Sequence, residues 1–239
     1  MELKLIEKRD ETKGTKSFFW QPEKPVNWFA GQYYYFTIPV MKYPDPRGNT
    51  RHFTISASPT EGNILRLTTR IREESGYKKT LDELTIGSEI EGEGPNGTFI
   101  LDETSDKSNI FIAGGIGITP FRSIIKYVVD KNLTTPIHLI YSNSVPEEIT
   151  FRKELEDWSK THLNIKVDIT ISHPEESKEP WTGLTGRIDE NLINKLVHDT
   201  ENPIFWVCGP PAMTDAIEQV LGKIKITSDR IRSEKFTGY

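Results

Sequence analysis

The chain has little of what several classes of protein require. It contains one cysteine, which excludes an internal disulfide and any iron–sulfur cluster held by four cysteines. Its five histidines are scattered without the HExxH spacing or a similar ligand pattern, so no dedicated metal site is predicted. The formal net charge of −5 argues against non-specific binding of nucleic acid.

Long apolar runs are also missing. Residues 1–14 alternate in charge and lack the apolar centre of a secretory signal. The longest weakly polar run, residues 110–121, has about a dozen residues, whereas a membrane span needs about twenty. These absences predict a cytoplasmic protein without a membrane span.

The residues that are present suit a folded chain of one large domain or two modest ones. Of 239 residues, 35% are hydrophobic and 27% are charged. Residues 32–38 are aromatic and β-branched, while residues 51–55 and 64–71 alternate apolar with polar side chains. Turn signals at residues 44–49, 61–63 and 94–97 lie around these segments. Short strands at this spacing predict a small antiparallel barrel.

The pattern changes near residues 103–108. Beyond this point, apolar strands are predicted at residues 110–113, 137–141, 165–171 and 204–208. Helices are predicted between them at residues 120–129, 151–159, 189–197 and 212–221. Such alternation predicts a parallel sheet with right-handed crossovers. We therefore expect a barrel domain over residues 1–103 and an α/β nucleotide-type domain over residues 108–239.

Three glycines follow the first strand of the expected α/β domain, in the segment GGIGITP at residues 114–120. Thr119 suits the N-cap of the next helix, and Pro120 suits its first position. Gly115 and Gly117 carry no side chain, so a ligand could approach the backbone at the positive end of the helix. This edge of a parallel sheet is the usual crevice for a nucleotide. The alternative is a tight strand–helix turn without a ligand.

Two further segments could bear chemistry. CGPPAM at residues 208–213 closes the last predicted strand, and we expect Cys208 to point into the same crevice as Gly115. Without a histidine partner, Cys208 is not expected to act as a nucleophile, and the alternative is a buried small side chain. In RHFTIS at residues 51–56, Arg51 and Phe53 share one face of a strand. Arginine pairs with phosphate and an aromatic ring stacks on a flat ligand, although an ordinary barrel strand has the same pattern.

Taken in this order, RHFTIS, GGIGITP and CGPPAM resemble the ferredoxin–NADP reductase superfamily of flavin and nicotinamide oxidoreductases. The resemblance covers essentially the whole chain, from FAGQY at residues 29–33 to FTGY at residues 236–239. It implies a barrel that binds FAD, or less frequently FMN, and an α/β domain that binds NADH or NADPH. It also implies hydride transfer from nicotinamide C4 to flavin N5, after which single electrons pass to a partner.

The resemblance assigns flavin-binding roles to individual residues of the barrel. Arg51 matches the arginine on the flavin pyrophosphate, and Phe53 matches the aromatic residue, more often tyrosine, that packs on the flavin. Thr54 matches the hydroxyl residue that approaches flavin N5.

The same resemblance extends to a phosphate-binding motif, GxxSxxL. It matches residues 75–81, with Ser75 in place of the glycine, Gly76 next, and Lys78 in place of the serine. Lysine can bind phosphate as a point charge. Arg70 and Arg72 could assist, although a solvated strand face is the alternative for both.

On the nicotinamide side, the resemblance assigns binding of the coenzyme to the glycine loop, to the segment after the second strand and to the last strand. These residues are Gly114, Gly115, Gly117, Thr119, Ser142, Asn143, Cys208 and Gly209. Cys208 is expected beside the nicotinamide ring. No arginine directly follows Ser142 and Asn143, which favours NADH, while Arg152 or Arg187 would be needed for NADPH.

The C-terminal segment carries the last predicted site. By resemblance, Phe236 stacks on the flavin where the nicotinamide must dock, and Gly238 lets Tyr239 turn away. Glu234 is expected to be a proton donor near the flavin. The alternative is a tail that packs against the last strand.

The sequence therefore predicts a flavin-dependent NAD(P)H reductase that passes electrons to a separate acceptor such as a ferredoxin, a flavodoxin or an oxygenase component. A basic patch at Arg66, Arg70, Lys78 and Lys79 would suit an acidic ferredoxin. One alternative is a reductase subunit of a multi-component oxygenase or another redox complex. Others are a non-catalytic nucleotide-sensing module and a flavin-free dehydrogenase, which would not need the barrel.

Overall fold

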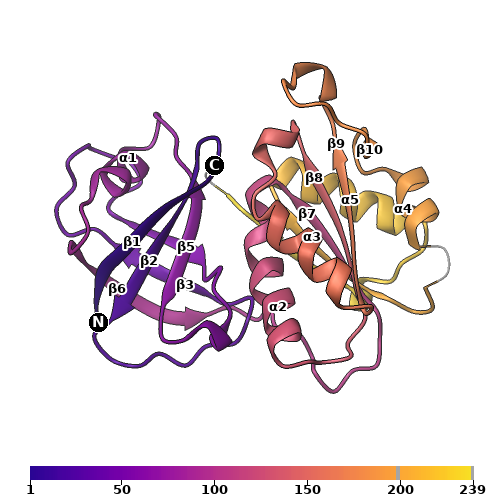
Figure 1. Ribbon diagram of the computed structural model, residues 1–239, viewed down its shortest axis with the longest axis horizontal. Coiled ribbons are helices and arrows are strands. Elements are labelled where there is room, and N and C mark those ends of the chain that lie inside the picture. The colour runs from indigo at the N-terminus through magenta and orange to yellow at the C-terminus, as the bar shows by residue number, and fades with distance from the viewer. Residues whose placement is uncertain (198–199, 238–239) are drawn as a thin grey trace.

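Two sheets lie side by side in the computed structural model, which describes residues 1–197 and 200–237 (Figure 1). The first half of the chain forms the sheet on the left of the view, and the second half forms the sheet on the right. Among the described residues, no helix combines the length and the apolar character needed to cross a bilayer.

The first domain is an antiparallel barrel. Its strands are β1 (Glu2–Thr12), β2 (Thr15–Pro22), β3 (Tyr33–Thr37), β4 (Thr50–Thr54), β5 (Leu65–Arg70) and β6 (Glu89–Asn96). They lie in the order β4-β3-β6-β1-β2-β5, and a bridge between Ile55 and Leu67 joins the two edges. One helix, α1 (Gly76–Glu83), lies between β5 and β6. The predicted antiparallel barrel is confirmed.

Strands β1 and β2 were not among the predicted elements. Charged residues dominate β1, but Leu3 and Leu5 alternate with them and are fully buried in the barrel core. This alternation is typical of a strand with one face in water. The high overall charge of the segment obscures that pattern in the sequence. The turn predicted at residues 94–97 was also misplaced, because β6 continues to Asn96.

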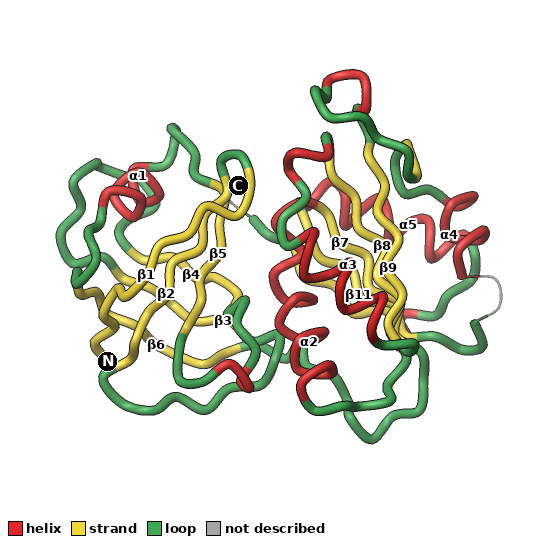
Figure 2. The backbone as a smooth tube through the Cα atoms, in the orientation of Figure 1, coloured by secondary structure: helices red, strands yellow, loops and turns green. Residues whose placement is uncertain are grey.

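The second domain is a parallel sheet covered by helices on both faces. Its elements are β7 (Asn109–Gly114), α2 (Ile118–Asp130), β8 (Ile137–Asn143), α3 (Arg152–Thr161), β9 (Ile165–Ile171), β10 (Leu184–Thr185), α4 (Glu190–Val197), β11 (Ile204–Gly209), α5 (Pro211–Lys223) and β12 (Ile231–Lys235). The strand order is β10-β9-β8-β7-β11-β12, and every neighbouring pair is parallel. Helices α2 and α3 cover the near face in Figure 2, while α4 and α5 cover the other. This fold was predicted.

The boundary predicted at residues 103–108 falls in the connection between β6 and β7. Phe99 and Leu101, which precede it, pack in the same apolar cluster as Phe111 and Phe121 of the second domain. The position of the boundary stays a prediction.

One buried arginine joins the two domains. Arg122 lies on α2 with its side chain 2% exposed, and it pairs with Glu61 from the barrel side and with Glu154 of α3. Its Nη2 donates to Glu61 Oε1 and to Glu154 Oε1, each at 2.9 Å, and its Nη1 donates to the carbonyl oxygen of Ser56 at 3.0 Å. Ser123 Oγ donates to the carbonyl oxygen of Ala57 at 2.6 Å. The start of α2 is thereby fixed against the barrel.

Replacing Arg122 with methionine should lower the free energy of unfolding by about 3 kcal/mol, because two carboxylates lose their buried counter-ion. Denaturant unfolding measures the change. The control is Lys126→Ala on the same helix, which breaks only a surface pair with Asp130 and should cost less than about 1 kcal/mol. Equal effects of the two substitutions would contradict the role given to Arg122.

Candidate functional site

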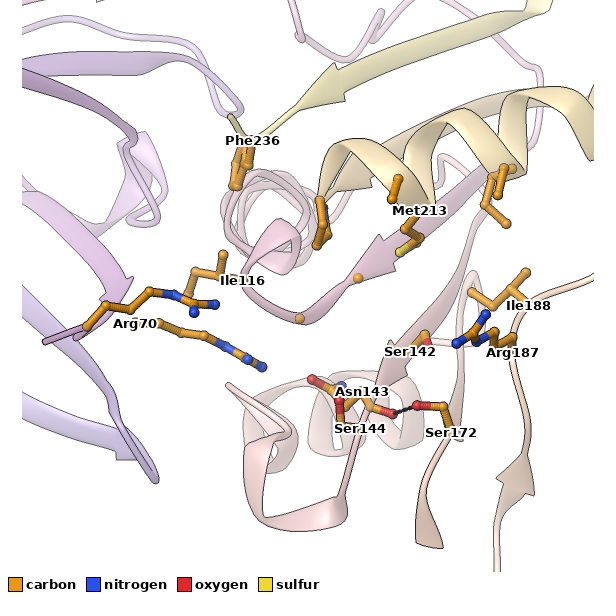
Figure 3. Close-up of a pocket in the computed structure, with 17 residues that line it drawn as sticks. Arg70, Ile116, Ser142, Asn143, Ser144, Ser172, Arg187, Ile188, Met213 and Phe236 are labelled. Carbon is orange, nitrogen blue, oxygen red and sulfur yellow. Dashed lines mark hydrogen bonds between the residues drawn. The ribbon is translucent and has the colours of Figure 1, made fainter. Parts of the chain in front are cut away.

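A cavity of about 400 Å³ opens at the carboxyl edge of the parallel sheet (Figure 3). Gly114 and Gly115 at the end of β7, Ser142 and Asn143 at the end of β8, and Met213 of α5 form part of its wall. Its size lies in the range of small-molecule sites, and its place is the one expected for a nucleotide in a parallel α/β sheet. The predicted crevice therefore exists.

Each glycine of the β7–α2 turn is required there for a different physical reason. Gly115 has a φ of +51°, which disfavours other residues, and its carbonyl oxygen accepts a hydrogen bond from Tyr141 Oη at 3.0 Å. A Cβ on Gly117 would lie 2.2 Å from the carbonyl oxygen of Cys208, and a Cβ on Gly114 would lie 2.0 Å from Met213 Sδ. Gly114 thus lets β7 pack closely against α5, and Gly117 lets the turn pack closely against β11. Gly115 instead allows the backbone conformation of the turn.

The predicted helix start is wrong by two residues. Helix α2 begins at Ile118 with Gly117 as its N-cap, because the short helical turn over residues 115–117 has already begun to wind the chain. Thr119 is therefore inside the helix, buried, with its hydroxyl donating to the carbonyl oxygen of Ile116 at 3.2 Å. Gly117 and Thr119 are not among the residues that line the cavity.

Three arginines line this cavity: Arg70, Arg72 and Arg187. Arg70 and Arg72 enter it from the barrel, whereas Arg187 lies at the opposite end in the view of Figure 3, near Ser142. No aspartate or glutamate is among the described lining residues. The arrangement favours an anionic ligand.

Arg70 also bridges the two domains. Its Nη2 lies 2.8 Å from Glu148 Oε2, which belongs to the segment between β8 and α3. The sequence considered Arg70 and Arg72 as aids to the flavin or as solvated strand residues, but both face the cavity of the α/β domain. Glu148 was missed, since only the fold brings it beside the barrel.

A second, narrower cavity of about 30 Å³ lies at the barrel. Phe53 and Thr54 of β4 lie on one side of it, and Glu234 and Phe236 of the C-terminal segment line it as well. Phe236 also lines the larger cavity, so its side chain lies between the two spaces. The narrow cavity is smaller than a flavin ring, so some of its lining residues would have to move for such a ring to enter. Residues 238 and 239 lie outside the part of the chain that the structure describes. The expectation that Tyr239 turns away from the flavin therefore concerns residues that are not described.

Two polar groups at the narrow cavity suit a polar heterocycle. Thr54 Oγ1 and Glu234 Oε2 are buried, and neither has a hydrogen-bond partner among residues 1–197 and 200–237. A buried polar atom without a partner is costly, and a ring with hydrogen-bonding edges would supply one. The residues present therefore fit the flavin that the resemblance implies.

Burial raises the pKa values of two groups on adjacent strands, Glu234 of β12 and Cys208 of β11. Glu234 on β12 has its pKa raised to about 7 by burial. Its register partner on β11 is Cys208, whose pKa is raised well above its ordinary value by burial and by the nearby charge of Glu234. Cys208 has no exposed surface and lines neither cavity. Its predicted position beside the nicotinamide stays a prediction.

The predicted phosphate-binding residues gather at the start of α1. Ser75 is the N-cap of this helix, with its Oγ accepting from the Lys78 backbone N–H at 3.2 Å. Arg51 and Lys78 line the narrow cavity together with Ser75. Burial, and then the charges of nearby arginines, lower the pKa of Lys78 to about 7. Gly76 instead packs against the barrel, since a Cβ there would lie 2.1 Å from the carbonyl oxygen of Pro44.

The basic patch predicted for an acidic ferredoxin does not form. Arg66 is buried and pairs with Glu11 at 2.6 Å, Lys78 is buried, and Arg70 pairs with Glu148. The alternating pattern of β5 could not show which of its faces the second domain covers.

Comparison with known proteins agrees with this architecture. Residues 111–219 match the family model described as an oxidoreductase NAD-binding domain. The glycine betaine monooxygenase reductase subunit of Chromohalobacter salexigens is 26% identical over 98% of the chain and 63% of its own length. NADH-cytochrome b5 reductase 1 of Dictyostelium discoideum is 30% identical over 76% of the chain and 63% of its own length. The chain thus spans less than two thirds of these relatives.

Solved structures of similar fold match nearly the whole chain. A ferredoxin–NADP⁺ reductase from Plasmodium falciparum superposes with a TM-score of 0.78, at 18% identity, over 98% of this chain and 95% of its own. The architecture shared with that structure is an antiparallel barrel followed by a parallel nucleotide-type sheet, and in this chain one cavity lies at each. The chain thus resembles the ferredoxin–NADP reductase-like family of FAD- and NAD(P)-binding oxidoreductases, in the NAD-binding family model over residues 111–219 and in the fold over nearly the whole chain.

The raised pKa of Glu234 predicts a pH dependence of stability. Its pKa moves from an ordinary 4.5 to about 7 in the folded state, so ionisation opposes folding. The stability it contributes is complete below about pH 4.5 and is lost as the pH rises through 7, by about 2 kcal/mol after allowing for partial exposure.

Denaturant unfolding of the wild type and of Glu234→Gln across this range measures the difference. The glutamine variant should gain stability relative to the wild type as the pH rises. Glu91→Gln, at an exposed barrel position, is the control for removal of a carboxylate. Parallel pH profiles for the wild type and Glu234→Gln would mean that the Glu234 carboxyl titrates as it does in water.

Proposed function

We propose that the protein transfers hydride from NAD(P)H to FAD and then passes electrons to a separate acceptor. The observation that carries the proposal is the position of Phe236, which lines both the cavity of the α/β domain and the cavity of the barrel. A single side chain thus separates the place where a nicotinamide would dock from the place where a flavin ring would lie. Its displacement would bring the two rings together.

The residues around this point have distinct proposed roles. A bound flavin would supply a carrier that accepts two electrons together and releases them singly. Thr54 would donate its unpaired hydroxyl to the ring, and Phe53 would pack against it. Glu234, half-protonated near neutral pH, would hold or deliver a proton at its carboxyl. Cys208, the register partner of Glu234 on the neighbouring strand, would position the nicotinamide through packing rather than by nucleophilic attack.

The acceptor is proposed to lie outside these 239 residues, because they hold one cysteine and cannot ligate a four-cysteine iron–sulfur cluster. The name of the Chromohalobacter salexigens relative describes a reductase subunit of a monooxygenase. By analogy, an oxygenase component is the acceptor we favour over a ferredoxin, for which the predicted basic patch is missing. FAD is favoured over FMN by analogy with the flavohemoglobin from Malassezia yamatoensis, a solved structure of the same fold that contains bound FAD.

The proposal is tested by NAD(P)H-dependent reduction of ferricyanide, a one-electron acceptor, with the purified protein. Turnover should depend on added or retained FAD, because the flavin alone converts a hydride into single electrons. Apoprotein assayed without flavin is the control. A nucleotide-sensing module would bind the coenzyme without ferricyanide reduction, and that result would contradict the proposed function.

The choice of coenzyme depends on Arg187. The sequence favoured NADH because no arginine directly follows Ser142, but the fold brings Arg187 into the same cavity wall as Ser142. Parallel nucleotide folds select NADH with an acidic residue on the ribose and accept NADPH with an arginine near the 2′-phosphate. The cavity wall contains Arg187, and no aspartate or glutamate is among its described lining residues. We therefore favour NADPH, against the expectation from the sequence.

Replacing Arg187 with alanine should lower kcat/KM for NADPH at least about tenfold, since one charge-assisted contact to phosphate contributes about 1.5–3 kcal/mol. The value for NADH should hardly change. Arg152→Ala is the matched control, because Arg152 pairs with Glu156 on α3 at 2.8 Å. If Arg187→Ala leaves NADPH kinetics intact, or if the wild type strongly prefers NADH, the coenzyme assignment is wrong.

A further inference from the structure

The carboxylate of Asp45 occupies a site that is built for an anion. Its side chain is 4% exposed, and each oxygen accepts two hydrogen bonds. Oδ1 accepts from the Arg47 backbone N–H at 3.0 Å and from Arg51 Nη2 at 2.6 Å, and Oδ2 accepts from Ser75 Oγ and the Tyr77 backbone N–H, each at 3.0 Å. Burial alone would raise the pKa of Asp45, but these donors lower it to about 2.

These donors largely coincide with the groups expected to hold a flavin phosphate. The resemblance assigns the phosphate to Arg51 and to the first backbone N–H groups of α1, where Ser75 is the N-cap. Arginine, a hydroxyl and N–H groups at a helix start bind phosphate and carboxylate by the same charge-assisted hydrogen bonds. In this structure they converge on a carboxylate of the chain itself.

Contacts with α1 and with Arg51 hold the loop that carries Asp45 at this site. Gly76 has no side chain, and its Cα faces the carbonyl oxygen of Pro44, which a Cβ would approach to 2.1 Å. Arg51 Nη1 donates to the carbonyl oxygens of Arg47 at 2.9 Å, Gly48 at 3.0 Å and Thr50 at 2.7 Å. Much of the guanidinium of Arg51 is therefore engaged by this loop.

Basic side chains also surround the narrow cavity. Arg47, Arg51 and Lys78 line it, and burial brings the pKa of Lys78 down, and that of Glu234 up, to about 7. A phosphate carries more negative charge than the Asp45 carboxylate and presents more acceptor oxygens. It would therefore compete effectively for the same donors.

We propose that Asp45 is a resident occupant of the flavin-phosphate site, which the phosphate of an incoming flavin displaces as residues 43–48 move. This inference rests on the proposed function, in which the barrel binds the flavin. Affinity for a phosphate-bearing flavin is then set by competition with Asp45, while affinity for the flavin ring is not. Removing the carboxylate should tighten phosphate recognition alone.

The test compares FMN with riboflavin, which differ by one phosphate, on apoprotein in phosphate-free buffer. The quantity measured is the ratio of the riboflavin Kd to the FMN Kd, obtained from quenching of flavin fluorescence. For Asp45→Ala this ratio should rise at least about tenfold over the wild type, with the riboflavin Kd changed less than about threefold. Asp82→Ala is the matched control, because Asp82 is on α1 but pairs with Lys16 outside the site, and it should leave the ratio unchanged.

A ratio that stays constant or falls in Asp45→Ala would overturn the proposal, since Asp45 would then orient Arg51 for the phosphate instead of competing with it. If neither the wild type nor the variants bind any flavin while coenzyme still binds, the proposed function itself is wrong, and this inference with it.

A measurement on the wild type covers the case in which Asp45→Ala does not fold. Amide hydrogen exchange of the peptide spanning residues 43–50 should increase when FMN binds, because the loop loses its contacts with α1. Riboflavin should not cause this increase. Equal protection of the peptide by FMN and riboflavin would overturn displacement of Asp45.

Discussion

The buried contact of Arg122 with Glu61 and Glu154 is the interaction on which the site depends. It crosses from α2 of the nucleotide domain to the barrel with both carboxylates held by one guanidinium. Helix α2 begins directly after the Gly115 turn, so fixing this helix also fixes the turn relative to β4 and β5. Arg70 and Glu148 add a second contact nearer the cavity. The two sheets thus hold their adjoining cavities in a fixed relation.

The C-terminal strand completes that site from the other side. β12 pairs with β11 in parallel register, which places Glu234 opposite Cys208, and the Phe236 backbone N–H donates to the carbonyl oxygen of Gly209 at 2.9 Å. The segment therefore both closes the edge of the sheet and delivers Phe236 to the boundary of the two cavities. The pairing with β11 agrees with a tail that packs against the last strand, and the stacking of Phe236 on a flavin stays a prediction.

Sequence patterns predicted the architecture because continuous apolar strands such as residues 110–113 and 204–208 have one physical explanation, burial on both faces. They failed where one face of a strand is charged and where an ion pair or a cavity joins residues far apart in the sequence. Strand β1 was hidden by its charged outer face, and Arg66 was taken as exposed although Glu11 neutralises it. Asp45 was noticed only as a turn residue, and Arg187 reaches the Ser142 wall from a loop more than forty residues later. Long-range electrostatics, unlike periodicity, leaves no local pattern.

The central claim is that a coenzyme in the larger cavity reduces a flavin in the barrel. An anaerobic titration of the FAD-loaded protein with NADPH, followed by the visible absorbance of the flavin, tests it most directly. The account predicts that the absorbance of oxidised flavin disappears with about one equivalent of coenzyme per flavin, because one hydride carries two electrons. An unchanged flavin spectrum with the coenzyme demonstrably bound, or a protein that retains no flavin in any form, would contradict it.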